Sequence, residues 1–160
     1  MKTLSKLILV FLILSFYSCD YFCDDMDINL AFVGFDSTDI NTIILRQYQP
    51  NNTFQNPIDT FLITRKNGPY MFTTINDTTI IFRNSGDDSA QITNGYDWDV
   101  YIPTKNKTIY ISNITRTPGT GKHGCLNPII SFKQDSLTII PSWIHTGQFW
   151  TEGYRAYIYK

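Results

Sequence analysis

The chain has 160 residues, with 13 basic and 14 acidic side chains, so its formal net charge is −1. This length is enough for one domain, and the balanced charge gives no electrostatic basis for binding nucleic acid. We therefore expect a single small domain and no nucleic-acid partner.

The first 18 residues have the features of a secretory signal. Lys2 and Lys6 precede an apolar run, Leu7 to Phe16, that only Ser15 interrupts. A membrane-spanning helix needs roughly 20 apolar residues, so this run is too short to cross a bilayer. A basic start, a short apolar stretch and a small residue before the cleavage point are typical of export signals. We expect residues 1–18 to be a signal peptide.

The residues around the expected cleavage point resemble a bacterial lipobox. They read Leu14-Ser15-Phe16-Tyr17-Ser18-Cys19. Enteric lipoboxes have Leu and then a small residue where Phe16 and Tyr17 stand here, and the looser pattern is similar to that of Bacteroidota lipoproteins. The resemblance implies a lipoprotein signal peptide, acylation of Cys19 and attachment to a membrane, which becomes stable with more than one acyl chain.

Residues 19–26 then form a short acidic tether. Aspartates cluster there and at the start of the domain, at Asp20, Asp24, Asp25 and Asp27. Such a patch is similar to the surface-export signal of Bacteroidota lipoproteins, and it is equally compatible with a plain solvated tether. We expect a lipid-anchored protein of the cell envelope, in the outer membrane, and leave open whether it faces the periplasm or the cell surface.

Three cysteines make an odd number for an exported chain. If Cys19 carries lipid, Cys23 and Cys125 remain as a pair in an oxidising compartment, and we predict a disulfide between them. Two unpaired thiols are the alternative. A zinc site built on Cys125 and His123 lacks further ligands at suitable spacing, so we expect no metal.

Composition and periodicity indicate an all-β domain over residues 27–160. Glu152 is the only glutamate, while aspartate, asparagine and threonine are frequent, and β-branched and aromatic residues dominate the apolar stretches. Polar turn signals separate short apolar runs, which favours a two-sheet antiparallel sandwich, immunoglobulin-like or related. The predicted strands are Ile28–Phe35, Ile40–Tyr48, Ile58–Thr64, Tyr70–Ile75, Thr78–Arg83, Tyr96–Ile102, Thr108–Thr115, Ile129–Lys133, Leu137–Ile140 and Tyr154–Tyr159.

The stretch from Tyr96 to Ile102 has the clearest strand pattern. Tyr96, Trp98, Val100 and Ile102 should face the core, and the turn Asn94-Gly95 should precede them. Asp97 and Asp99 then share the opposite face, about 7 Å apart by strand geometry. We expect this pair to be exposed, as a solvated strand face or a weak cation site.

No pattern in the chain indicates catalysis or a cofactor. His123 and His145 lie in separate segments, and a Gly-x-Ser-x-Gly nucleophile turn is missing. The run Gly119–Gly124 matches the spelling of a dinucleotide fingerprint, but Pro128 follows closely and prevents the helix that this motif requires. We expect a protein that is not an enzyme and has no cofactor.

Aromatic residues concentrate in the segment Pro141–Gly153. Trp143, His145, Phe149 and Trp150 lie there without a strand pattern. Rings on sandwich loops bind sugar faces in many carbohydrate-binding modules and form hot spots at protein interfaces. They also fill the ends of small sandwiches, so ligand binding and core packing are both open for this segment.

Taken together, the chain resembles a group of small Bacteroidota lipoproteins. The resemblance rests on the loose lipobox, the acidic tether, Ile40–Tyr48 and Gly95–Val100. No activity or binding residue is implied by it. We expect a non-catalytic, membrane-anchored envelope lipoprotein that acts in binding or assembly, with envelope proteins or glycans as partners. The alternative is a glycan-binding module that uses the segment 141–153.

Overall fold

Ten strands and one short 3₁₀ helix make up the described part of the computed structural model, which comprises residues 27–51, 53–65, 70–83, 91–118, 127–144 and 153–160. In chain order they are β1 (Ile28–Val33), β2 (Thr42–Tyr48), β3 (Asp59–Thr64), β4 (Tyr70–Ile75), β5 (Thr78–Arg83), β6 (Asp97–Ile102), η1 (Pro103–Lys105), β7 (Lys107–Arg116), β8 (Ile129–Gln134), β9 (Leu137–Ile139) and β10 (Tyr154–Tyr159).

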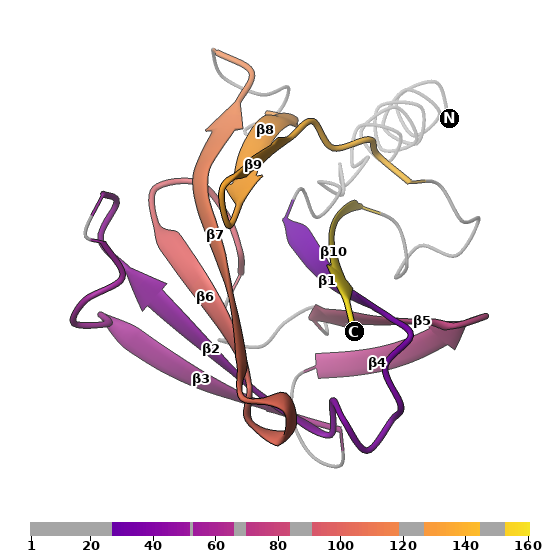
Figure 1. The fold of residues 1–160 in the computed structure, drawn as a ribbon. Coiled ribbons are helices and arrows are strands. Elements are labelled where there is room, and N and C mark those ends of the chain that lie inside the picture. The colour runs from indigo at the N-terminus through magenta and orange to yellow at the C-terminus, as the bar shows by residue number, and fades with distance from the viewer. Residues whose placement is uncertain (1–26, 52, 66–69, 84–90, 119–126, 145–152) are drawn as a thin grey trace, which may run out of the picture.

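The strands form two sheets that pack face to face (Figure 1). Sheet A has the order β10-β1-β5-β4, and sheet B has the order β3-β2-β6-β7-β8-β9. The predicted all-β, two-sheet sandwich is confirmed. One pair departs from antiparallel pairing: β1 and β10 run parallel, from Ile28 opposite Tyr154 to Val33 opposite Tyr159.

All ten predicted strands are present, and no boundary is displaced by more than two residues. The first strand ends at Val33 because Gly34 adopts a left-handed backbone conformation, with φ of 73°. Gly95 has φ of 91°, so the predicted turn precedes β6. Tyr96 lies outside β6 and is 39% exposed, which corrects its assignment to the core face.

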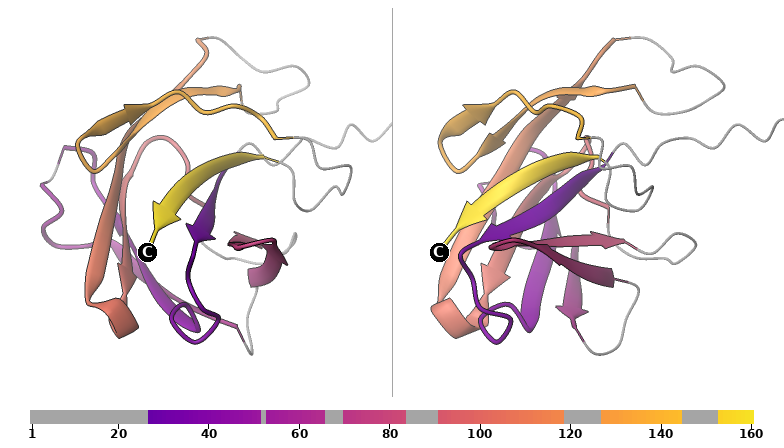
Figure 2. Two further views of the ribbon diagram at one scale, coloured as in Figure 1. Left: turned by 45° about the vertical axis from the view of Figure 1, so that its right-hand side comes forward. Right: turned by 90° about the vertical axis from the view of Figure 1, so that its right-hand side faces the viewer.

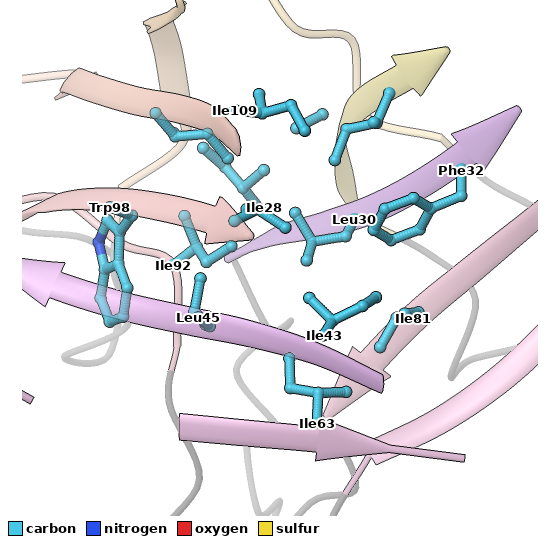
Figure 3. Close-up of a cluster of buried hydrophobic side chains, with 14 of the residues drawn as sticks. Ile28, Leu30, Phe32, Ile43, Leu45, Ile63, Ile81, Ile92, Trp98 and Ile109 are labelled. Atoms are coloured by element: carbon cyan, nitrogen blue, oxygen red, sulfur yellow. The ribbon is translucent and has the colours of Figure 1, made fainter. Parts of the chain in front are cut away.

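The core lies between the two sheets. Trp98, Val100 and Ile102 of β6 are almost fully buried there and belong to the same cluster as Leu30 and Phe32 of β1. Figure 3 shows side chains from sheet A and sheet B meeting across this layer. Burial of these side chains from both sheets is the main force that holds the sandwich together.

Sheet B is strongly curved, so that β8 and β9 arch towards β10 (Figure 2). In the described residues, no strand ladder joins the two sheets there. Instead, Gln134 Nε2 donates to the carbonyl of Tyr157 at 2.7 Å, and Lys107 Nζ donates to the carbonyl of Tyr159 at 2.5 Å. Side chains of sheet B thus cover part of the free edge of β10.

Polar clusters mark the two ends of the sandwich. At the end where β1 begins, the buried Arg116 lies 3.7 Å from Asp27 and donates hydrogen bonds to Asn94, Thr93 and Asn127. At the opposite end, Lys160 pairs with Asp36 and Asp39, and Lys105 pairs with Asp39. We call these last four residues, Asp36, Asp39, Lys105 and Lys160, the far-end cluster.

Candidate functional site

Asp97 and Asp99 are buried, contrary to the exposed pair expected from the sequence. Their exposed fractions are 6% and 2%. They do lie on the opposite face of β6 from Trp98, which was predicted. The loop after β2, two side chains of β2 and the backbone of β7 contact these carboxylates, and this cover explains the burial. A strand pattern in one segment cannot reveal such a cover.

Asp99 uses both carboxylate oxygens within the protein. Arg46 Nε donates to Oδ1 at 2.9 Å, and the hydroxyl of Tyr48 donates to Oδ2 at 2.7 Å. The register explains the meeting, because Arg46 is directly opposite Asp99 in the pairing of β2 with β6. A buried carboxylate needs such donors, since burial without them costs several kcal/mol.

Asp97 binds two backbone amides instead of side chains. The amide of Asn51 donates to Oδ2 at 2.9 Å, and the amide of Asn113 donates to Oδ1 at 3.4 Å. Asn51 lies in the loop after β2, and Asn113 is a left-handed residue, with φ of 51°, at an irregularity in the pairing of β7 with β8. Asp97 thereby holds both segments against the sheet.

The loop after β2 contains an unusual run of strained backbone. Asn51, Thr53, Phe54 and Asn56 all have positive φ, between 45° and 63°. Asparagine tolerates this conformation, whereas a β-branched or bulky residue rarely adopts it. A β-branched or bulky residue in this conformation costs of order 1–3 kcal/mol of stability. Backbone strain of this kind is concentrated at functional sites.

The strained loop places an aromatic ring over the sheet. The ring of Phe54 lies 5.4 Å from that of Tyr48 and 4.4 Å from that of Tyr110. Beside them, the guanidinium of Arg46 lies over Tyr101 at 5.7 Å. Tyr110 is 38% exposed and the side chain of Arg46 is 33% exposed. We call Arg46, Phe54, Tyr101 and Tyr110 the aromatic platform.

The surroundings of the site favour the neutral form of Tyr48 and the charged form of Arg46. Burial, followed by the hydrogen bond to Asp99, raises the pKa of Tyr48 to about 12. Burial opposes the charge of Arg46, but the hydrogen bond and the charge of Asp99 outweigh it and raise the pKa of Arg46. Tyr48 is therefore a neutral donor and Arg46 a cation at physiological pH.

Trp143 is the one residue of the predicted aromatic set that the structure describes. It is partly buried, packs against the main core, and its ring lies 5.2 Å from that of Tyr154 in an edge-on arrangement. Burial raises the pKa of Tyr154. These contacts favour the packing interpretation for Trp143.

The other predicted site residues lie outside the described part of the chain. They are Cys19, Cys23, His123, Cys125, His145, Phe149 and Trp150. Lipidation of Cys19 and the Cys23–Cys125 bridge therefore stay predictions. In the described residues, no helix is long and apolar enough to cross a membrane, and no three His, Cys, Asp or Glu side chains gather as metal ligands would.

The sequence pattern did not predict the aromatic platform. Its residues come from β2, the following loop, β6 and β7, so their proximity depends on strand register. One signal was available: Arg46 and Tyr48 alternate on β2 with the same period as Asp97 and Asp99 on β6. Comparisons of the chain with protein-family models, curated proteins and solved structures gave no match.

Proposed function

We propose that this protein is a non-catalytic lipoprotein of the cell envelope, anchored through Cys19, which binds a partner through the aromatic platform. The observation that carries the proposal is the strained loop that holds Phe54 against Tyr110. Strain at Thr53 and Phe54 costs stability, and such a cost is typical of segments whose shape is used in binding. An exposed tyrosine beside an arginine, as Tyr110 lies here with Arg46, is typical of binding hot spots.

The arrangement of the carboxylates supports binding over catalysis. Each oxygen of Asp97 and Asp99 accepts a hydrogen bond from a donor of the protein itself. A general acid or a nucleophile must reach a substrate with such an oxygen. In this site the carboxylates instead fix the loop and Arg46, whose positions define the platform.

The anchor would keep the platform close to a membrane. Residues 20–26 separate Cys19 from Asp27, the first residue that the structure describes. Seven residues extend to at most about 25 Å. The tether enters at the strand end marked by Asp27 and Arg116, whereas the platform lies on a sheet face, so anchoring and binding would use different parts of the domain.

The anchor is tested by intact-mass measurement of the mature protein from its native host, before and after reduction. We expect a mass that begins at Cys19 and includes acyl chains, with an increase on reduction from the predicted Cys23–Cys125 bridge. A mass without acyl chains would contradict the membrane anchor. An unchanged mass on reduction would contradict the bridge and leave the anchor standing.

The platform is tested by placing a photocrosslinking amino acid at position 110 in the native host. We expect a specific adduct there, and Phe54→Ala should lower its yield about tenfold, the effect of losing about 1.4 kcal/mol. The matched control carries the probe at Leu137, which is 68% exposed on β9. Equal adducts at positions 110 and 137, or an undiminished yield in Phe54→Ala, would exclude the platform as the binding surface.

A further inference from the structure

The four sheet edges of this sandwich differ in length and in how far other side chains cover them. Sheet A ends at β10 and β4, and sheet B ends at β3 and β9. Gln134 and Lys107 bind two carbonyls at the free edge of β10, those of Tyr157 and Tyr159, and β9 has only three residues. Covered and very short edges are common ways to prevent strands of other molecules from pairing. By contrast, β3 and β4 are both six-residue edge strands with no lysine and no proline, and β3 has the more exposed apolar side chain, since Leu62 is 62% exposed and Met71 of β4 is 41% exposed.

The exposed edge of β3 is also apolar. Leu62 is 62% exposed, and Ile58 just before the strand is 48% exposed. The amide of Arg65 donates to the carbonyl of Asn41 at 3.2 Å, so the odd-numbered residues are those bonded to β2. Leu62 and Thr60 therefore direct their backbone groups to the free edge. Consistent with this, the amide of Thr60 binds the side chain of Asp59, at 2.7 Å.

The sequence of this strand is complementary to itself when read in the opposite direction. From residue 59 to residue 65 it is Asp-Thr-Phe-Leu-Ile-Thr-Arg. In an antiparallel pair centred on Leu62, Asp59 lies opposite Arg65, threonine opposite threonine, and Phe61 opposite Ile63. Even-numbered residues then face even-numbered residues, which is the register that the free backbone groups of Leu62 require.

We propose that β3 pairs with β3 of a second copy of this chain, antiparallel and with Leu62 on the twofold axis. The two six-stranded sheets then become one continuous sheet. Such a contact is self-complementary and closes after two copies, as symmetric dimers do. The exposed side chain of Leu62 becomes covered by its own counterpart.

Arg65 supplies the positive charge that this register places opposite a carboxylate. Its guanidinium lies over the ring of Phe72 at 5.1 Å. In the dimer, Asp59 of the second copy lies directly opposite Arg65 on the same face, because both residues are odd-numbered. In the dimer, the amide of Thr60 donates to a backbone carbonyl of the second copy and no longer to the carboxylate of Asp59.

The register is tested with Leu62→Cys in the full-length protein. Residues in a hydrogen-bonded antiparallel pair have Cα atoms about 5.5 Å apart, within the range of about 4.4–6.8 Å that a disulfide allows. We expect mild oxidation to join two copies through position 62, in a cross-linked peptide that mass spectrometry distinguishes from any formed by the native cysteines. Matched variants are Met71→Cys on the β4 edge and Leu137→Cys on β9. A cross-link at position 71 but not at 62, or none above the Leu137→Cys background, overturns the proposal.

Charge reversal tests the pairing without cysteines. Asp59→Arg and Arg65→Asp each place like charges opposite one another twice in the dimer, and we expect each to weaken self-association by about tenfold in sedimentation measurements. The combined variant restores opposite charges and should recover association. This recovery separates pairing from folding, since Arg65→Asp also removes the contact with Phe72. Unchanged single variants, or a combined variant no better than the single ones, overturn the pairing.

Discussion

Tyr48 joins the apolar and polar parts of the site in one side chain. Its ring contacts Phe54 and its hydroxyl donates to the buried carboxylate of Asp99. An aromatic ring packs well beneath the strained loop, while the hydroxyl satisfies an oxygen of a buried side chain. The residue therefore links the strained loop to the buried carboxylate of Asp99.

Tyr48→Phe should destabilise the protein by about 1–3 kcal/mol, because Asp99 Oδ2 loses its donor while the ring contacts remain. The measurement is urea unfolding at neutral pH. Tyr101→Phe is the matched control, because its hydroxyl binds Asn106 at the surface, and we expect a change within about 0.5 kcal/mol. Equal losses in both variants would show that the buried bond has no special role.

The same tyrosine predicts a pH dependence. Its pKa of about 12 in the folded protein exceeds the ordinary value of 10.0, so the unfolded chain loses this proton first. The stabilising contribution of neutral Tyr48 is complete below pH 10 and is lost as pH rises towards 12. The difference in stability between the wild type and Tyr48→Phe should therefore shrink over this interval.

Single residues were the scale at which sequence reasoning was weakest. The alternation around Trp98 correctly placed Val100 and Ile102 in the core, because one face of a strand has a period of two. The same alternation gave no information about what covers the other face. Asp97 and Asp99 were expected to be exposed, but β2 and the loop that follows it, far earlier in the chain, cover them.

Local elements were predicted well for a physical reason. Turns such as Asn94-Gly95 depend on residues that tolerate positive φ, and strands depend on β-branched and aromatic runs, so both are encoded in short windows. Strand order, the parallel pairing of β1 with β10 and the irregularity at Asn113 depend on contacts between distant segments. Those features were not predicted. The platform depends on the strand order and on the irregularity at Asn113, and it does not depend on the parallel pair.

The strained loop gives a prediction at the scale of the element. Thr53 has φ of 45°, a conformation that glycine adopts without steric cost. Thr53→Gly should stabilise the protein by about 1 kcal/mol in urea unfolding, because relief of strain exceeds the added chain entropy. Thr108→Gly, in the extended strand β7, should instead destabilise by about 0.5–1 kcal/mol. If both variants destabilise to the same extent, the loop is not strained.

At the scale of the whole molecule, the far-end cluster ties the two sheets together. Asp36 and Asp39 lie in the connection between β1 and β2, Lys105 follows β6 of sheet B, and Lys160 follows β10 of sheet A. Hydrogen bonds from Lys105 and then Lys160 lower the pKa of Asp39 to about 2, and Asp36 and Asp39 raise the pKa of Lys160.

The cluster should make stability depend on pH in acid. The pKa of Asp39 falls from 3.8 in the unfolded chain to about 2 in the folded one, so its contribution is complete above about pH 4 and is lost as pH falls to about 2. Thermal unfolding of Asp39→Asn should therefore depend less on pH than the wild type over this interval. Replacing Lys105 and Lys160 by methionine should have the same effect, and a pH dependence unchanged in both variants would contradict it.

The parallel pairing of β1 with β10 also constrains the order in which the protein can fold. Residues 34–153 separate the two strands, and the chain must close this long loop before sheet A is complete. Contacts this distant in sequence form slowly. If the chain is threaded across a membrane from its amino terminus, β1 emerges first and leaves one edge open until the last strand follows. Sheet B has no such dependence, because each of its strands pairs with the next one in sequence or with β6. In that case sheet B would assemble first, and sheet A would close only when translocation ends.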